Sequence, residues 1–471
     1  MLKNNKVRIV CTIGPNSLNK TSLKKFYLAG MSVARLNGSH SDLNWHKKAV
    51  KTIRETFPEL PILFDIPGKK IRTLQLNSDY HFNKGHLITL TTNVKYKGSD
   101  KVPINYPLLH KDVKAGDIIM ADDGTLKFKV KSIKGKDIII QSNNKGILKS
   151  RKGINIPKVL IKKEDITKED KKLIHFACKF NLEFIGLSFI ETTSQIDKIK
   201  KLIKNQVPKI VSKIENYKGI KNVDTISKNS DVIMIDRGDL SVETNLQSIA
   251  LNQKKIIEIS KKNNCPVIVA TEMLNSMIDN PFPTKAEITD ITNAVIDGCS
   301  ATMLSGETAI GKFPVESIKL MKKTISSAEN YISKKILNKN FLSDNIFNDY
   351  IGKIVENSPV TKIVVITRSG YAAKVISSKM PEKPILAISD DKFSSKSFNL
   401  FPGTKGIYYK EKFPKNTSDH VFKIISFLYK NKYIIKNDNI IVTGLIYPYP
   451  GCRMNFIQYH KVPELVKNFK W

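Results

Sequence analysis

The chain has 471 residues, of which 41% are apolar and 26% charged, a composition typical of folded globular proteins and unlike that of disordered ones. Its formal net charge of +35 comes mostly from lysines spread along the whole chain, which indicates a solvated basic surface and argues against nucleic acid as a partner. The five cysteines are scattered without a CxxC pair, and no apolar run approaches the roughly 20 residues that cross a bilayer, so we expect a cytoplasmic protein without a membrane segment.

Short, β-branched, apolar runs alternate with amphipathic segments along the first 305 residues. Most runs are apolar throughout, as in parallel strands that are buried on both faces. One intervening helix has clear ends, because Thr284-Lys-Ala-Glu287 fits a capping box and Gly298 is a stop signal. Eight such strand–helix units predict an α/β fold with a closed (β/α)8 TIM barrel. The runs are Val7–Ile13, Ser32–Leu36, Ile62–Ile66, Phe184–Ile190, Lys209–Ile214, Val232–Ile235, Pro266–Ala270 and Ala301–Leu304.

Two further regions differ from the barrel in their pattern of strands and turns. Residues 69–160 contain Asp-Gly turns and alternating strands such as Lys127–Ile133 and Asp137–Gln141, which predict an inserted small β domain. Residues 332–471 contain strand–turn–helix units, such as Lys362–Ile366 followed by the turn Thr367–Gly370, and predict an open α/β domain. The barrel itself would then consist of residues 1–68 and 161–331.

Polar residues follow the carboxyl ends of the predicted barrel strands, where (β/α)8 enzymes have their active sites. Glu215 and Asp239 follow adjacent strands and could chelate one magnesium ion, while neighbouring cations could hold an anionic substrate. This set predicts phosphoryl transfer, which depends on positioning and charge neutralisation more than on a protein nucleophile. The strand-end residues are Arg35, Asn37, Ser39, His40, Asp65, Ser188, Lys213, Glu215, Arg237, Asp239, Thr271, Ser305 and Glu307.

At these motifs the chain resembles the pyruvate kinase family over nearly its whole length. The resemblance implies a catalytic barrel, a small β-barrel lid domain inserted after the third strand, and a C-terminal regulatory α/β domain. The strings Ser-Lys-Ile-Glu-Asn and Met-Leu-Ser-Gly-Glu-Thr-Ala are the most specific. The matching stretches are Ile9–Pro15, Ala34–His40, Asp65–Arg72, Lys152–Pro157, Ser212–Asn216, Arg237–Leu240, Ala270–Leu274 and Met303–Ala309.

The resemblance implies a phosphotransferase that moves the phosphoryl group of phosphoenolpyruvate to ADP in glycolysis, giving pyruvate and ATP, with Mg²⁺ or Mn²⁺ as cofactor. Lys213 would stabilise the phosphoryl group in flight, Arg35 would bind the phosphate, and Thr271 would lie in the proton path to pyruvate. Glu215 and Asp239 would ligate the metal. The implied substrate-binding residues are Arg35, Lys213, Gly238, Asp239 and Thr271, and the implied nucleotide-binding residues are Asn37, His40, Arg72 and Lys152.

Asn37, Ser39 and Asp65 match the family's monovalent-cation ligands. The next position, usually threonine, is Ile66, which could contribute its backbone carbonyl. Lys70, however, stands where potassium-dependent members carry glutamate. Its ammonium group could supply the positive charge that K⁺ supplies elsewhere. We therefore predict catalysis that does not require potassium.

Other positions also depart from the family pattern. Asp236 replaces the usual alanine and Glu272 the usual glutamine, and both add negative charge near a site for anions. Either residue could attract a second metal or weaken phosphoenolpyruvate binding, and the sequence leaves both open, as it does the effects of Ser241 and Ser300. The turn Thr367–Gly370 could cradle a phosphorylated effector. The family resemblance also implies a homotetramer.

Two other functions compete with this interpretation. A diverged paralogue could keep the fold as a non-catalytic binding protein whose basic surface holds nucleic acid. A related barrel enzyme could act on enolpyruvate or 2-oxo acids without a nucleotide, although the matches at Arg72 and Lys152 argue against it. Catalysis as a kinase is favoured because the chain keeps the whole implied set of Arg35, Lys213, Glu215, Asp239 and Thr271.

Overall fold

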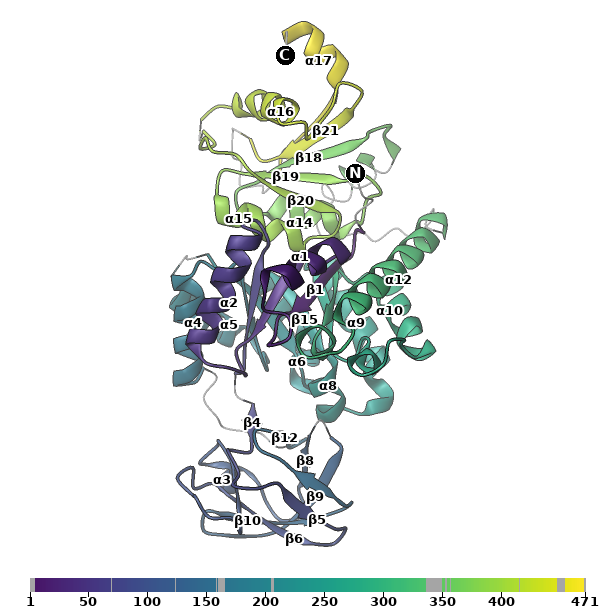
Figure 1. Cartoon of the computed structure of the whole chain (residues 1–471). Coiled ribbons are helices and arrows are strands. Elements are labelled where there is room, and N and C mark those ends of the chain that lie inside the picture. The colour runs from purple at the N-terminus through teal and green to yellow at the C-terminus, as the bar shows by residue number, and fades with distance from the viewer. Residues whose placement is uncertain are drawn as a thin grey trace.

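The computed structural model describes residues 5–68, 70–122, 124–157, 159, 166–204, 207–335, 350–351, 354–355, 357–414, 416–446 and 454–469. Three units lie along one axis, with the barrel in the middle, the β-rich insert at one end and the C-terminal α/β unit at the other (Figure 1). None of the described helices is both long and apolar enough to span a membrane.

The central unit is a closed barrel in which every paired neighbour is parallel. This confirms the predicted fold class. Side chains of Val10, Leu63, Phe184 and Met234 pack in one buried cluster, as expected for strands without an exposed face. In the order around the barrel, the strands are β1 (Arg8–Thr12), β17 (Ala301–Leu304), β16 (Val267–Ala270), β15 (Val232–Asp236), β14 (Lys209–Ile214), β13 (Phe184–Leu187), β3 (Ile62–Ile66) and β2 (Val33–Asn37).

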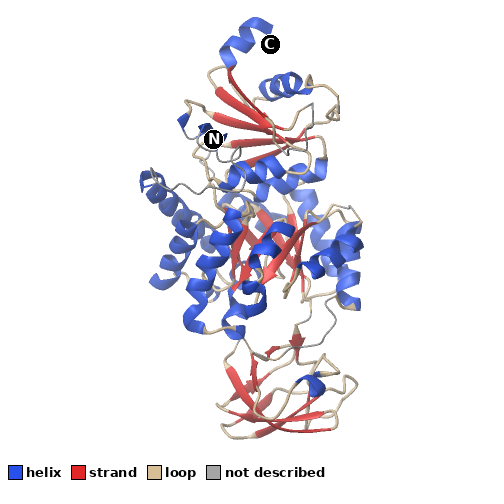
Figure 2. Cartoon of the chain, turned by 180° about the vertical axis from the view of Figure 1, so that it is seen from behind, coloured by secondary structure: helices blue, strands red, loops and turns tan. Residues whose placement is uncertain are grey.

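Helices surround the barrel strands on the outside (Figure 2). In α10 (Lys285–Asp297), Thr284 and Glu287 form the predicted capping box, and Gly298 ends the helix in a left-handed conformation with φ 95°. The other helices of the barrel are α1 (Lys20–Ala29), α2 (Leu43–Thr56), α4 (Lys168–Lys179), α5 (Thr193–Ile203), α6 (Tyr217–Lys221), α7 (Val223–Asn229), α8 (Arg237–Glu243), α9 (Ile249–Lys262), α11 (Gly306–Ala309) and α12 (Pro314–Lys335).

The insert follows β3 and is a seven-stranded sheet with a separate two-stranded sheet beside it. A single antiparallel bridge between Thr73 and Ile104, the residues that follow β4 and β7, links the two edges of the larger sheet. The seven strands are, in order, β4 (Ile71–Arg72), β12 (Gly153–Asn155), β8 (Ile118–Ala121), β9 (Leu126–Lys134), β10 (Asp137–Ser142), β6 (Leu87–Thr91) and β7 (Val102–Pro103); β11 (Gly146–Leu148) pairs with β5 (Tyr80–Phe82), and α3 is Leu109–Asp112.

The C-terminal unit is an open five-stranded sheet, parallel except for its last strand. It contacts the barrel through two cations, the half-buried Arg8 and the buried Lys396. The Arg8 guanidinium donates to the carbonyls of Phe401 and Thr404, and the Lys396 ammonium donates to the Pro58 carbonyl at 2.6 Å. The domain boundaries at 68, 160 and 331 stay predictions. The elements are β20 (Thr404–Tyr408), β19 (Ile385–Ser389), β18 (Lys362–Ile366), β21 (Asn439–Gly444), β22 (Phe456–Lys461), α14 (Tyr371–Ser378), α15 (Lys392–Ser397), α16 (His420–Lys430) and α17 (Val462–Phe469).

Candidate active site

A polar cleft opens at the carboxyl ends of the barrel strands, on the side that faces the insert. Of the strand-end residues that the sequence analysis singled out, all except His40, Glu215 and Arg237 line this cleft. Lys70 and Arg72, at the start of the insert, line the same cleft. The cleft is lined among others by Arg35, Asp65, Lys213, Asp236, Asp239 and Thr271.

The Lys213 ammonium, on β14, is the most heavily paired cation in this cleft. Its Nζ lies 2.9 Å from Oε1 of Glu215, 3.0 Å from Oδ2 of Asp236 and 3.4 Å from Oδ2 of Asp65, and it donates to Oγ of Ser188 at 3.1 Å. Burial lowers the pKa of Lys213, but the three carboxylates outweigh burial and raise this pKa well above its ordinary value. The side chain is therefore a fixed positive charge at the mouth of the barrel.

Three carboxylates, those of Glu215, Asp236 and Asp239, form an acidic cluster with ligand oxygens all within 4.8 Å of one another. Burial, with the neighbouring charges of Asp239 and Asp236, raises the pKa of Glu215 to about 8 against the opposing effect of Lys213. Oε1 of Glu215 and Oδ1 of Asp239 are buried. Each contacts one ammonium group, that of Lys213 at 2.9 Å and that of Lys70 at 2.6 Å, and in the described part of the chain neither oxygen accepts from any other donor. Buried carboxylate oxygens with spare lone pairs are the ligands that a hard divalent cation prefers, so these residues fit such an ion.

Lys70 lies directly against this cluster. Its Nζ is 2.6 Å from Oδ1 and 2.7 Å from Oδ2 of Asp239, although the two residues are 169 positions apart in the chain. Both side chains are largely buried, at 13% and 7% exposed. The residue that the sequence analysis expected to replace a monovalent cation is thus an ion-pair partner of a predicted metal ligand.

The four predicted monovalent-cation residues lie together at the ends of β2 and β3, where Asn37 is the register partner of Asp65. Oδ1 of Asn37 accepts from the Ser39 amide at 3.0 Å, and the Ile66 carbonyl accepts from the Ser188 hydroxyl at 3.0 Å. Oδ1 of Asp65 accepts no hydrogen bond from the described residues. Their oxygens are therefore partly committed to protein donors.

Arg35 is buried and held rigidly at the end of β2. Its Nη2 lies 2.6 Å from Oδ2 of Asp65, and its Nη1 donates to Oγ1 of Thr12 at 3.0 Å. The sequence analysis did not single out Thr12, which ends the first barrel strand. Applying the strand-end rule to β1 as well would have found it.

Thr271 follows β16 with an unusual backbone, at φ 66°, which a β-branched residue rarely adopts. The Arg237 guanidinium donates to the Thr271 carbonyl at 2.6 Å and to the Glu272 carbonyl at 3.0 Å, and it pairs with Asp290 on α10. The amide of Gly238 donates to Oγ1 of Thr271 at 2.9 Å. Neighbouring groups thus determine the position of both the backbone and the hydroxyl of Thr271.

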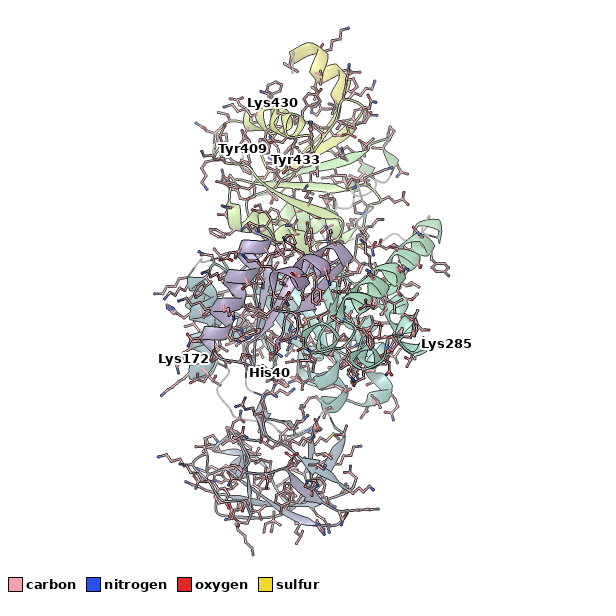
Figure 3. The ribbon with its side chains drawn as sticks, viewed as in Figure 1. His40, Lys172, Lys285, Tyr409, Lys430 and Tyr433 are labelled. Carbon is pink, nitrogen blue, oxygen red and sulfur yellow. The ribbon has the colours of Figure 1, made fainter. Side chains whose placement is uncertain are left out.

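The predicted nucleotide-binding residues lie on both sides of the cleft. His40 lies at the edge of the barrel that faces the insert (Figure 3). Desolvation lowers the pKa of His40, and the cations Arg72, Arg35 and Arg151 lower it further, so the imidazole is neutral near pH 7. On the insert, the Arg72 guanidinium donates to the Arg151 carbonyl at 3.1 Å, and Lys152 pairs with Asp122 at 2.7 Å.

The turn Thr367–Gly370 connects β18 to α14 in the C-terminal unit, far from this cleft (Figure 1). The Arg368 guanidinium donates to the Phe413 carbonyl and lies 3.4 Å from Oδ2 of Asp390. Lys209, at the start of β14, donates to the Ser369 carbonyl at 2.7 Å. The turn is therefore tied to the barrel through a lysine, and its own arginine contacts other parts of the C-terminal unit.

Comparison with known proteins gives one consistent result. A family model described as "Pyruvate kinase, barrel domain" matches residues 4–318, and one described as "Pyruvate kinase, alpha/beta domain" matches residues 350–451. The chain is 35% identical to a pyruvate kinase of Clostridium perfringens, over 93% of this chain and 96% of the relative, and 34% identical to one of Thermococcus litoralis, over 94% and 95%. A crystal structure of a pyruvate kinase from Cryptosporidium parvum superposes with a TM-score of 0.83 at 30% identity, covering 98% of this chain and 97% of that one.

Proposed function

Because the chain belongs to the pyruvate kinase family of phosphotransferases, we propose that it transfers the phosphoryl group of phosphoenolpyruvate to ADP in glycolysis, with the cleft around Lys213 as its active site. One observation carries this proposal. A buried ammonium, a guanidinium and an acidic cluster converge at the carboxyl ends of β2, β14 and β15. Phosphoryl transfer requires such cations and metal ligands to position the substrates and neutralise charge.

In this reaction the bond between phosphorus and the C2 oxygen of phosphoenolpyruvate breaks, and a bond forms from phosphorus to a β-phosphate oxygen of ADP. The enolate that remains takes one proton at C3 and becomes pyruvate. Lys213 and Arg35 would neutralise the negative charge on the phosphoryl oxygens, in particular at the transition state between donor and acceptor. Their fixed ion pairs mean that little reorganisation is needed when the reaction occurs.

Glu215 and Asp239 would hold Mg²⁺, for which Mn²⁺ could substitute. When bound, the ion supplies positive charge to the phosphoryl oxygens and a fixed orientation for the substrate. The backbone amides of Gly238 and Asp239, at the first turn of α8, would lie near the substrate carboxylate. The proximity of the three carboxylates, whose ligand oxygens lie within 4.8 Å of one another, supports this assignment.

Thr271 would lie in the proton path to C3 of the enolate. Its hydroxyl is held by the Gly238 amide, so it presents one face to the cleft. A proton delivered from one fixed direction gives a defined stereochemistry at C3.

We further propose that catalysis is independent of K⁺. The Lys70 ammonium on Asp239 brings a positive charge to the cleft from the insert. Oδ1 of Asn37, Oγ of Ser39 and the carbonyl of Ile66 already accept hydrogen bonds from protein donors. Burying the Lys70 ammonium beside Asp239 costs less free energy than burying it unpaired. The positive charge of Lys70 is therefore present in the cleft without K⁺.

ADP would bind between the barrel and the insert, against Asn37, His40, Arg72 and Lys152. This assignment rests on the family match and on the position of His40 at the barrel edge (Figure 3). Cytoplasmic localisation, a homotetramer and a phosphorylated effector at Thr367–Gly370 stay predictions. The described cysteines are free and buried, which agrees with a reducing compartment.

The proposed function is tested by measuring pyruvate formation from phosphoenolpyruvate, ADP and MgCl₂ in an assay coupled to lactate dehydrogenase. Turnover that requires both substrates supports the kinase. A chain that shows no turnover but shifts DNA or RNA in a salt-sensitive gel assay would instead be a binding paralogue. Turnover of enolpyruvate or a 2-oxo acid without any nucleotide would favour the third alternative.

A further inference from the structure

Asp236 touches both of the groups to which the proposed function gives a chemical role. It ends β15, between β14 and β16, and its side chain is buried, with 6% of the residue exposed. Oδ2 lies 3.0 Å from Nζ of Lys213, and Oδ1 lies 3.3 Å from Oγ1 of Thr271. One carboxylate therefore spans the lysine of one neighbouring strand and the threonine that follows the other.

The other carboxylates around Lys213 have competing partners. Oδ2 of Asp65 already accepts from two nitrogens of Arg35, and Glu215 is a proposed metal ligand. In the described part of the chain, the side-chain ion pairs and hydrogen bonds of Asp236 go to Lys213 and Thr271. Asp236 belongs to the same acidic cluster, but each of its two oxygens has a partner among the described residues, so Asp236 can keep Lys213 in place while Glu215 and Asp239 hold a metal.

The Thr271 hydroxyl has a single hydrogen and two acceptors within reach. It donates to the Ala270 carbonyl at 2.6 Å or to Oδ1 of Asp236 at 3.3 Å, while accepting from the Gly238 amide. The Ala270 carbonyl belongs to the barrel strand and directs the hydrogen back toward the protein. Asp236 offers the alternative acceptor, so the direction of the hydroxyl hydrogen depends on it.

We propose that Asp236 is a positioning residue for both halves of the reaction: Oδ2 holds the Lys213 ammonium where the phosphoryl group crosses, and Oδ1 directs the Thr271 hydroxyl where C3 is protonated. This inference rests on the proposed function. Asp236 forms no bond to substrate. It acts through two neighbours that would otherwise be positioned independently, and its charge balances one of the cations that surround the transferred group.

Two rates separate this role from a merely structural one. The kcat of the coupled assay reports the complete forward reaction. The exchange of the C3 hydrogens of pyruvate for deuterium, followed by proton NMR in D₂O with Mg²⁺ and ATP, reports proton transfer at C3 without net turnover. If Asp236 positions both groups, Asp236→Ala should lower each rate at least about tenfold while the KM for phosphoenolpyruvate stays within about threefold.

Asp236→Asn tests the same idea without loss of volume. Its amide has one acceptor oxygen and no charge, so it can serve only one of the two partners at a time. We expect both rates to lie between those of the wild type and Asp236→Ala, and at least about threefold below the wild type. This variant decides the question alone if Asp236→Ala does not fold. Glu272→Gln is the matched control, because it removes one negative charge from an exposed side chain that follows Thr271.

The possible outcomes are distinct. If the wild-type protein shows no turnover, the proposed function is wrong, and the role of Asp236 is wrong with it. An active wild type, with Asp236→Asn equal to it in both rates, shows that only volume matters and overturns the proposal. A change confined to KM, or to one of the two rates, also overturns it. Equal losses in Glu272→Gln would assign the effect to general electrostatics of the cleft and would contradict positioning.

Discussion

Lys70 and Asp239 form an ion pair in which one ammonium contacts both oxygens of one carboxylate, at 2.6 and 2.7 Å. The pair joins the beginning of the insert to the first turn of α8 in the barrel. It therefore connects the unit that covers the cleft to a proposed ligand of the metal.

Replacing KCl by NaCl or tetramethylammonium chloride should change the kcat of the wild type less than about twofold, because Lys70 supplies a positive charge to the cleft. Lys70→Met removes that charge and leaves Asp239 without its partner, so kcat/KM should fall about 30-fold, or roughly 2 kcal/mol, in every salt. Steady-state kinetics at constant ionic strength measure both effects. A wild type whose activity collapses without K⁺ would refute potassium independence.

Lys213→Met should lower kcat by about 10²–10³-fold, equivalent to roughly 3–4 kcal/mol of transition-state stabilisation, because a preorganised charge is lost where negative charge moves. The KM for phosphoenolpyruvate should change much less. Lys218→Met is the control, since Lys218 lies four residues away from β14 on α6, with a side chain that is 49% exposed. A similar loss in the control, or an active Lys213→Met, would contradict the assigned role.

Removal of divalent metal with EDTA should abolish turnover, and Mg²⁺ or Mn²⁺ should restore it. Glu215→Gln keeps the shape of the side chain but cannot lose a proton to become a carboxylate ligand, so its apparent affinity for Mg²⁺ should fall at least about tenfold. Titration of activity with MgCl₂ measures the change. An identical Mg²⁺ dependence in the variant and the wild type would exclude Glu215 as a ligand.

Arg237→Lys tests whether the left-handed backbone at Thr271 has to be held in place. Lysine keeps the charge but cannot donate through a planar fork to the carbonyls of Thr271 and Glu272. We expect kcat to fall about tenfold. The less firmly held backbone should also destabilise the folded protein, which calorimetry would show as a lower Tm. Asp290→Asn, which weakens only the outer ion pair of Arg237, should have a smaller effect on kcat.

Lys209 should make stability depend on pH in the alkaline range. Burial lowers the pKa of Lys209 to about 8, from its ordinary value of 10.5. Between these two values the unfolded chain binds the proton and the folded chain does not, so folding stability rises with pH in this window and has no such slope below it. Calorimetry from pH 7.5 to 10 should show the Tm of the wild type rising relative to Lys209→Met. A constant difference would contradict the effect.

The barrel could be predicted because its strands carry a strong, local signal. Runs such as Val232–Ile235 are apolar at every position, and the predicted capping box of α10 lies in four consecutive residues. Lys213, Glu215 and Asp239 followed from the rule that the active site lies at the carboxyl ends of the strands. These inferences require only the position of a residue along its own strand.

The partners of these side chains could not be predicted in the same way. Asp236 was recognised as an extra negative charge, but its contact with both Lys213 and Thr271 depends on side-chain conformations across three neighbouring strands. The pairing of Lys70 with Asp239 depends on how the insert is placed over the barrel, which no local pattern contains. Thr271 has a left-handed backbone conformation, which β-branched residues rarely adopt, so the conformational preference of threonine does not predict it.

Lys70 enters the cleft as part of the insert, two residues after Gly68 at the end of the barrel segment. Grafting the lid of a potassium-dependent relative onto this barrel would therefore replace the ammonium by a carboxylate and leave Asp239 beside it. The resulting chimera should inherit the donor's salt requirement along with its lid. On the proposed role of Lys70, ion preference would move between relatives together with the insert, a segment that contributes no strand to the barrel.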